Sequence, residues 1–416
     1  NPHVDTWRDF CEAQGAGGRG LGVDTDPENL RRLEEGLPSL ELTVADLREV
    51  RCGETVMLKA NQVEAAVAKF AKFGVGPRLC ALVKDELLKG VSRRIASMAR
   101  NMEYQEEMLG LDVDDQVRFF GETVSPDTED ETFELTRRWL EQRYAGVEDE
   151  IERLSWLRLD RIAMRLLGTQ SVSSSEWLYL RLLVTGRGDT NARYVMIDEV
   201  QDYSLAQLMV LARFFSRAHF LMLGDEHQAI REGTASFDEI RELFAQSHGS
   251  VDECRLLTSY RSSPEITSLF SGLVEHDSPV KLASVHRAGV APRIEALSGR
   301  DEFLAALYEV VAGASEDEGL TAIVAADDGA VSWLSKQLGD TAEVISRDRE
   351  LPATGVVIMS LRLAKGLEFD HVIIPDASVE TYPDTPLARR RLYTAISRAM
   401  HKATLLAQGE LSPLLG

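Results

Sequence analysis

The chain has 416 residues, 44% hydrophobic and 27% charged, so it is long enough for two or three domains and ordinary for a folded protein. Its formal net charge of −22 argues against nonspecific coating of nucleic acid, although a narrow basic track or an acidic face for a basic partner remains open. No apolar run approaches the ~20 residues that cross a bilayer, and the four cysteines lack metal or redox spacing. We therefore expect a cytoplasmic protein with no membrane contact.

The first motif along the chain is glycine-rich. Gly15-Ala-Gly-Gly-Arg-Gly20 matches the G-x-G-x-x-G pattern, and its outer glycines also have phosphate-loop spacing. However, no strand precedes it, no helix opens after it, and Leu21-Gly22 stand where a phosphate loop requires Lys-Ser/Thr. The sequence therefore predicts a flexible or rearranged terminus here. No Gly-Lys-Ser/Thr occurs anywhere in the chain.

Short elements are expected up to residue 59. Asp26 is a candidate N-cap with Pro27 at the first helical position, so a helix should begin there. Leu40–Val44 alternates like a strand, and Val56–Leu58 predicts another. Both could join the same sheet as the apolar segment Tyr194–Ile197.

Residues 60–180 are dominated by helical periodicity. We expect two helical pairs separated by the acidic loop Ser125–Glu131; the predicted helices are 63–73, 85–109, 132–144 and 147–167. Four large side chains at helical spacing predict a core, with a partner-binding face as the alternative: Trp139, Leu140, Trp156 and Leu157. A last helix, Ser173–Leu183, leads back to the sheet. We interpret residues 60–180 as a helical insertion.

Two carboxylates follow the apolar segment Tyr194–Ile197, which predicts a buried strand. Asp198 and Glu199 stand where that strand should end, and Ser204 is a candidate N-cap for a helix up to Phe215. Ligands of open α/β sheets lie outside the carboxyl ends of the strands, so paired carboxylates there suit Mg²⁺ and a water-orienting base. A polar turn without a ligand is the alternative.

The remaining elements predict further strands of the same kind. His219–Asp225 reads as a second buried strand that ends in a carboxylate, with Gln228 three residues on. Near residues 245–255 the chain is expected to enter a second domain, where helical stretches separate apolar, β-branched strands and favour a parallel α/β unit. Those strands are 321–325, 356–359, 372–374 and 403–406.

Five segments carry a resemblance when taken in order. They read Asp198-Glu-Val-Gln-Asp202, Leu223-Gly-Asp-Glu-His-Gln-Ala-Ile230, Leu257-Thr-Ser-Tyr-Arg-Ser262, Ser360-Leu-Arg-Leu-Ala-Lys-Gly-Leu-Glu-Phe-Asp370 and Leu392-Tyr-Thr-Ala-Ile-Ser-Arg-Ala399. They resemble motifs II to VI of superfamily 1 helicases of the UvrD/Rep type. The resemblance implies an α/β fold with two RecA-like parallel-sheet domains: an incomplete first domain (1–59 and 181–247) with the helical insertion 60–180, and a second domain (248–416).

The resemblance also implies a role in ATP hydrolysis for residues of motifs II and III. Asp198 would hold Mg²⁺, and Glu199 would orient and deprotonate the attacking water. Gln228 would sense the γ-phosphate and link the nucleotide to a nucleic-acid or partner surface. The implied cofactors are therefore ATP and Mg²⁺.

Motifs IV to VI supply the other implied site residues. Arg261 and Arg398 would neutralise charge on the transferring phosphoryl group, the latter as an arginine finger. Tyr260 would stack on the adenine and Glu368 would accept from the ribose, with Gly366 in the same nucleotide-binding set.

Three features resemble HelD, the helicase-like ATPase that binds bacterial RNA polymerase. They are the continuation of motif II through Tyr203 and Ser204, the short interval between Arg261 and Ser360, and the ending Gly409–Leu415. The implied function is ATP-driven domain closure that remodels or recycles RNA polymerase and nucleic-acid complexes, with the insertion as an arm that contacts the polymerase. A UvrD-like DNA helicase or translocase acting on single-stranded nucleic acid is one alternative, and a nucleotide-independent binding module with residual motifs is another.

The chain departs from the family's pattern at several points. Motif I, the Walker A phosphate loop, and the upstream glutamine motif are absent from this sequence. Arg362 stands where motif V usually has His, and Arg231 where Tyr usually follows motif III. The chain is thus either a piece of a longer ATPase or a relative that has lost ATP binding, and we expect it to be inactive alone.

Overall fold

The computed structural model describes residues 4–16, 26–255, 258–259, 261–274, 283–284, 289–346 and 349–416. Most of the glycine-rich motif and Tyr260 lie outside the described residues. The chain divides into two compact units, one of residues 1–193 and 205–219 and the other of residues 194–204 and 220–416. The domain limits expected from the sequence stay a prediction.

The first unit is mainly helical. It contains α1 (Trp7–Ala13), α2 (Pro27–Gly36), α9 (Leu159–Leu167), α10 (Ser174–Thr185) and α11 (Leu205–Phe214), and α10 packs against the other three large helices. Asp26 caps α2 as expected, accepting from the Glu28 backbone N–H at 2.9 Å with Pro27 at the first position.

The prediction of a strand at Leu40–Val44 is wrong. The segment leads into a 3-10 helix at Val44–Asp46, because Thr43 and Asp46 cap it reciprocally: the buried Asp46 carboxylate accepts from both Thr43 N–H and Thr43 Oγ1–H at 2.8 Å. The other predicted segment lies in β2 (Thr55–Leu58), which pairs antiparallel with β1 (Val50–Cys52). These two strands form a sheet of their own, so neither joins the later strands.

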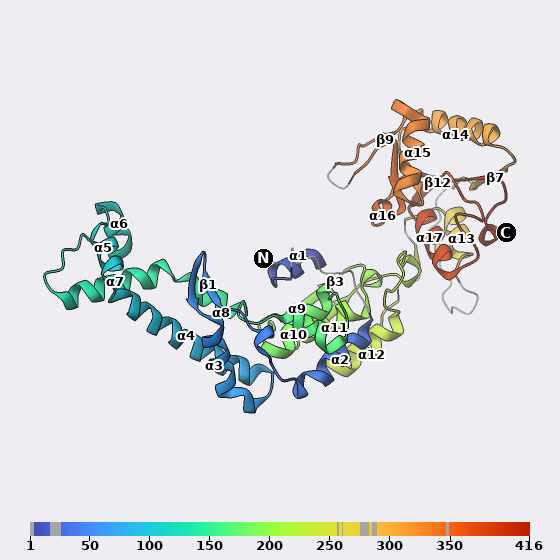
Figure 1. Ribbon diagram of the computed structural model, residues 1–416. Coiled ribbons are helices and arrows are strands. Elements are labelled where there is room, and N and C mark those ends of the chain that lie inside the picture. Colours follow the sequence, from blue (N-terminus) through green and yellow to red (C-terminus); the bar gives the residue numbers. More distant parts are fainter. Residues whose placement is uncertain are drawn as a thin grey trace. The chain divides into compact units, whose positions relative to one another are not determined.

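The predicted helical insertion forms an arm in the first unit (Figure 1). Its helices are α3 (Ala60–Phe70), α4 (Pro77–Ala99), α5 (Met102–Leu109), α6 (Val113–Phe120), α7 (Glu129–Arg143) and α8 (Gly146–Glu152). α4 is the long shaft, and it buries one stripe of residues at near four-residue spacing: Leu79, Val83, Leu87, Val91, Ile95 and Met98. The four Trp and Leu residues expected in the core are all buried, with at most 6% exposure.

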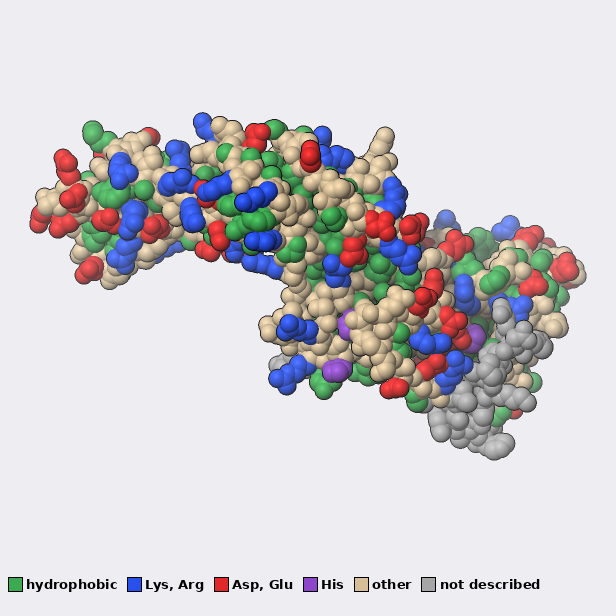
Figure 2. Space-filling view, turned by 90° about the horizontal axis from the view of Figure 1, so that it is seen from below, with side chains coloured by type: hydrophobic (Ala, Val, Ile, Leu, Met, Phe, Trp, Pro, Cys, Tyr) green, Lys and Arg blue, Asp and Glu red, His purple; other side chains and the backbone are tan. Residues whose placement is uncertain are grey.

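Helix boundaries in the arm differ from the prediction where a cap intervenes. The expected helix over 85–109 breaks at Asn101, whose side chain accepts from the Glu103 backbone N–H at 3.0 Å and starts α5. α7 begins at Glu129, capped by Thr128, so it takes in part of the expected acidic loop. Residues 101–131 contain a single basic residue, Arg118, and Figure 2 shows acidic side chains, with basic ones among them, at the free end of the arm.

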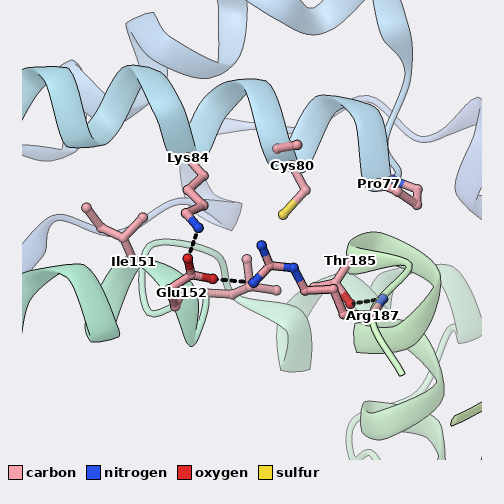
Figure 3. Close-up of a pocket in the computed structure, with 9 residues that line it drawn as sticks. Pro77, Cys80, Lys84, Ile151, Glu152, Thr185 and Arg187 are labelled. Atoms are coloured by element: carbon pink, nitrogen blue, oxygen red, sulfur yellow. Dashed lines mark hydrogen bonds and ion pairs between the residues drawn. The ribbon is translucent and has the colours of Figure 1, made fainter. Parts of the chain in front are cut away.

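Ion pairs fix the base of the arm to the body of the first unit (Figure 3). Lys84 of α4 and Arg187, which follows α10, both pair with Glu152 at the end of α8. The Arg187 backbone N–H also donates to Thr185 Oγ1 at 3.1 Å. The adjacent hollow, which Cys80 lines, has a volume of about 30 Å³. It has room for about one water molecule and is too small for a substrate.

A six-stranded parallel sheet forms the core of the second unit. Its order is β7-β12-β11-β8-β10-β9, and every recorded pair is parallel. The strands are β7 (Arg293–Leu297), β8 (Leu320–Ala325), β9 (Glu343–Val344), β10 (Gly355–Ser360), β11 (Phe369–Ile374) and β12 (Ala399–Gln408). The four strands expected from the sequence lie within β8, β10, β11 and β12, so the α/β, RecA-like fold class is confirmed.

Helices cover both faces of this sheet. Alternate residues of β8, such as Ala322 and Ile323, enter two different cores. One core includes α13 (Pro264–Ser271), α16 (Leu361–Ala364) and α17 (Pro386–Ile396). The other includes α14 (Arg300–Ser315) and α15 (Asp328–Leu338). α17, which precedes Arg398 in the chain, therefore packs against the first of these two faces.

Small elements complete the second unit. β3 (Tyr194–Ile197) and β4 (His219–Met222) pair in a two-stranded sheet, followed by α12 (Phe237–His248). The prediction that these two strands are buried is wrong, because in the described structure they pair with each other alone and leave Tyr194, Met196 and Leu221 exposed. β5 (Thr258–Ser259) pairs with β6 (Ala283–Ser284). Among the described residues, no helix is both long and apolar enough to span a membrane.

Candidate functional site

The turn after β3 places the paired carboxylates. Glu199 adopts a left-handed backbone conformation, with φ of +51° and ψ of +43°, which is strained for a residue with a side chain. Its backbone N–H donates to Asp198 Oδ1 at 2.9 Å. Asp198 is exposed and Glu199 is half-buried, so both carboxylates are accessible from solvent.

Gln201 connects these carboxylates to the next loop. Its side chain is buried; Nε2 donates to Glu199 Oε2 at 2.5 Å, and Oε1 accepts from the Asp225 backbone N–H at 3.1 Å. Gly224 must be glycine for this contact, since a Cβ there would lie 2.2 Å from Gln201 Oε1. Gln201 has no role in the expected set, although it lies inside motif II.

Asp225 and Gln228 form the second part of the site. The two Asp225 oxygens accept from the His227 backbone N–H at 3.0 Å, from Gln228 Nε2 at 2.8 Å and from the Tyr393 hydroxyl at 3.3 Å. Burial and the Asp225 carboxylate raise the pKa of Tyr393, so the hydroxyl keeps its proton and donates. Asp225 therefore orients the Gln228 side chain toward α17.

Arg398 is the buried cation of the site. It is 2% exposed, and Nη2 donates to Gln228 Oε1 at 2.8 Å while Nε donates to Thr394 O at 3.2 Å. Burial lowers the pKa of Arg398, and the Arg261 cation adds to this, but a guanidinium remains charged at neutral pH. The three residues Glu199, Gln228 and Arg398 thus belong to one hydrogen-bonded network through Gln201 and Asp225.

Lys365 is a second cation, a residue of motif V to which the resemblance assigned no role. Its side chain is 7% exposed, and Nζ donates to Asp202 Oδ1 at 2.6 Å and to Gln228 O at 2.9 Å. Nζ also lies 3.5 Å from Glu199 Oε2. The signal was present, since Lys365 stands in motif V next to Gly366, but its partners depend on tertiary packing.

The remaining expected residues lie in two places. Arg261 pairs with Glu368 at 2.6 Å, and both side chains are about 40% exposed, at 43% and 40%. Arg261 was expected to act on a phosphoryl group and Glu368 on a ribose, but in this structure the two side chains pair with each other. Gly366 has φ of +83°, a conformation that favours glycine. Tyr260 lies outside the described residues.

The donor set suits a magnesium ion only in part. The described residues contain no group of three His, Cys, Asp or Glu side chains that could hold a metal. Mg²⁺ is commonly held by one or two carboxylates together with substrate phosphates, so the exposed Asp198 fits such a ligand. The site therefore offers a carboxylate for a phosphate-bound cation and no complete metal cage.

The parallel α/β unit and its linked carboxylates, glutamine and arginine are those of a helicase-like protein with a RecA-like domain. Residues 100–232 match the UvrD/REP helicase N-terminal domain, and residues 355–406 match the UvrD-like helicase C-terminal domain. These ranges contain motifs II, III, V and VI in full. The chain belongs to the UvrD/Rep superfamily of helicase-like, superfamily 1 proteins.

Individual relatives are also helicases by name. A probable DNA helicase of Mycoplasma pneumoniae is 24% identical over 205 residues, which is 46% of this chain and 37% of that protein. The chain thus spans little more than a third of that relative's length. A second match is the crystal structure of the C-terminal domain of a possible DNA helicase from Lactobacillus plantarum WCFS1, which is 32% identical. The match covers 38% of this chain and 92% of that domain's chain, with a TM-score of 0.32. The solved structure of the PRRSV helicase is 17% identical. That match covers 53% of this chain and 36% of the PRRSV chain, with a TM-score of 0.31.

Proposed function

We propose that this chain carries the hydrolytic half of an ATP-dependent helicase-like protein that remodels or recycles RNA polymerase and nucleic-acid complexes, as HelD does. The network that runs from Glu199 through Gln201, Asp225 and Gln228 to Arg398 carries the proposal. It joins a carboxylate, a glutamine and an arginine, the groups that phosphoryl transfer requires for water activation and charge neutralisation.

Each residue has a role that follows from its surroundings. Asp198 is the candidate ligand of Mg²⁺, which when bound supplies positive charge beside the phosphates. Glu199 is the candidate base, since its carboxylate is accessible and Gln201 fixes its direction. Arg398 is a donor in a buried position, where a charge is weakly screened, and the half-buried Gln228 accepts from it.

Lys365 and Glu368 are positioning residues in this proposal. Lys365 lies within reach of Glu199, Asp202 and the Gln228 carbonyl, so it holds the motif II turn and the motif III turn at a fixed distance. Glu368 holds Arg261 through their ion pair. A ligand that takes the Arg261 guanidinium would have to compete with Glu368.

The arm supports the polymerase reading over the translocase reading. The segment from α5 to α7, residues 102–143, holds four arginines against 13 carboxylates, so its excess negative charge would repel a phosphate backbone and attract a basic protein surface. A UvrD-like DNA translocase is the second candidate function, and the similarity to the probable DNA helicase of Mycoplasma pneumoniae favours it.

Two measurements test these proposals. In the full-length gene product, release of bound nucleic acid that depends on RNA polymerase supports the first, whereas ATPase activity stimulated by single-stranded DNA alone supports the second. For this chain alone, calorimetry with Mg-ATP should detect very weak binding or none, because the sequence contains no phosphate loop. Micromolar affinity would overturn that expectation.

A further inference from the structure

The arm of the first unit carries opposite charges along its length. The segment from Lys59 to Arg100, which covers α3 and α4, holds nine basic residues against three acidic ones. Residues 102–117, which cover α5 and most of α6, hold six carboxylates and no Lys, Arg or His; we call them the arm tip. Figure 2 shows basic side chains gathered over the middle of the arm. The proposed hydrolytic centre uses neither segment.

Four cations form a stripe along one face of α4. This basic stripe consists of Arg78, Lys89, Arg93 and Arg100, and all four residues are exposed. Their separations of 11, 4 and 7 residues are close to whole numbers of helical turns, so they lie on one side of the helix. At roughly 1.5 Å per residue, the stripe is about 33 Å long. Arg93 pairs with Glu86 at 3.1 Å, whereas Arg78 and Lys89 have no ion pair within the described part of the chain. The stripe therefore has cations available to a partner.

The arm tip is apolar as well as acidic. Four of its large hydrophobic side chains are between 47% and 71% exposed: Met102, Leu109, Val113 and Val117. Met102 and Leu109 lie on one face of α5 together with the exposed Glu106, and Val113 and Val117 lie on one face of α6. A merely solvated acidic face does not need these apolar side chains. They indicate a surface that another molecule covers.

We propose that the arm tip of one copy of this chain docks on the basic stripe of a second copy, in an antiparallel pair of arms. α4 runs toward the arm tip, since α5 follows it in the chain (Figure 1). Turning one arm end to end therefore brings each tip to the half of the other stripe that contains Arg78 and Lys89. Both contacts form at once around a two-fold axis, which closes the assembly at two copies.

The two surfaces match in charge and in polarity. Carboxylates of the arm tip face the cations of the stripe, and like charges are kept apart. The apolar side chains of the tip lie against the aliphatic stems of Arg78 and Lys89 and against Phe73, a half-buried ring over which the Arg78 guanidinium stacks at 4.2 Å. The second copy thus covers both kinds of group that the tip exposes.

A nucleic acid fits the arm less well than a second copy does. The arm tip continues directly from the basic stripe, and its six carboxylates repel phosphates, as does the formal net charge of −22. A phosphate backbone would also leave the four apolar side chains in water. The pairing needs neither nucleotide nor polymerase, so the proposal stands whether or not the proposed function holds.

The test is a charge swap, measured by sedimentation equilibrium of this chain. One variant reverses the stripe, with Arg78→Glu and Lys89→Glu, and another reverses the tip, with Glu106→Lys and Asp114→Lys; all four residues are exposed. The matched control makes the same change of net charge as the stripe variant at exposed positions of α14 and α15, with Arg300→Glu and Lys336→Glu. Thermal unfolding followed by circular dichroism checks that each variant folds.

We expect the parent chain and the control to dimerise. Their dissociation constant should be at least about tenfold higher at about 1 M salt than at about 0.1 M, because the Debye length falls from about 10 Å to about 3 Å. Each charge-reversed variant alone should associate at least about tenfold more weakly than the parent chain. An equimolar mixture of the two should recover the dimer, since one contact is then the native one and the other pairs the new lysines with the new glutamates.

Recovery in the mixture separates a direct contact from a general loss of structure. A parent chain that stays monomeric overturns the proposal, and so does an oligonucleotide that binds the stripe of a monomeric chain. Dimerisation that is unchanged in both charge-reversed variants, or that is lost in them and not recovered in the mixture, overturns it as well.

Discussion

Lys365 offers a direct test of the network, because the contacts of one side chain join three parts of the site. Lys365→Met removes a cation that is 7% exposed and that contacts Asp202, Glu199 and the Gln228 carbonyl. Removing one partner of a buried ion pair costs about 3–5 kcal/mol. The Asp202 and Glu199 side chains are 26% and 41% exposed, so solvent screens them and we expect about 2 kcal/mol.

Scanning calorimetry measures this loss. For a unit of about 200 residues, 2 kcal/mol lowers the melting temperature by roughly 4–8 °C. Amide exchange should also rise in the two turns, residues 198–204 and 226–231, and nowhere in the arm. The matched control is Lys336→Met, an exposed lysine of α15 with an expected effect below about 0.5 kcal/mol. An unchanged melting temperature and unchanged exchange in Lys365→Met would refute the reasoning.

Two further predictions concern titratable groups outside the site. Burial lowers the pKa of His371 from 6.5 to about 4, and the Lys402 cation adds to the effect, so the His371 imidazole is neutral in the folded protein at neutral pH. The neutral imidazole's contribution to the free energy of unfolding is therefore complete above pH 6.5 and is lost as the pH falls toward 4. Between pH 6.5 and pH 4 the free energy of unfolding, measured with urea, should drop by up to about 3 kcal/mol more in the parent chain than in His371→Gln. An equal drop in the two proteins would contradict this. Burial also raises the pKa of Cys80 to about 11, so at pH 8 iodoacetamide should modify it far more slowly than the exposed Cys254. Equal modification rates by mass spectrometry would argue against a buried Cys80 thiol.

The central strands of the six-stranded sheet could be predicted from the sequence because they are buried on both faces. β8 and β10 are mainly apolar with β-branched residues, and β11 ends in the apolar run Val372–Ile374, so tertiary contacts reinforce what their composition favours. β7 was missed, since it is an edge strand whose Arg293 and Glu295 pair at 2.8 Å at the surface. Its polar residues hide the alternation on which a prediction depends.

Local capping explains the errors in the first unit. Leu40–Val44 alternates, but the reciprocal hydrogen bonds of Thr43 and Asp46 favour a 3-10 turn, and Asp46 is further held by Arg165 at 3.1 Å. Asn101 likewise breaks a continuous helical pattern. Such caps involve single side chains, which periodicity over a long window averages out.

The candidate site was only partly accessible from sequence. Motif order placed Glu199, Gln228 and Arg398 in the expected set, and the structure brings these three into one network. It also pairs Arg261 with Glu368, which no motif predicted. The roles of Gln201 and Lys365 depend on which turns pack together, and that information is absent from a single sequence.

The central claim is that Glu199 is the base of an ATP-hydrolysing centre. The most direct test is Glu199→Gln in the full-length gene product, with ATP turnover and nucleotide binding measured on the same protein. The substitution keeps the shape of the side chain and an oxygen for the Gln201 contact, but it removes the carboxylate. We predict that turnover falls by at least about a hundredfold while nucleotide affinity changes little. Normal turnover in this variant would remove Glu199 as the base and contradict the account.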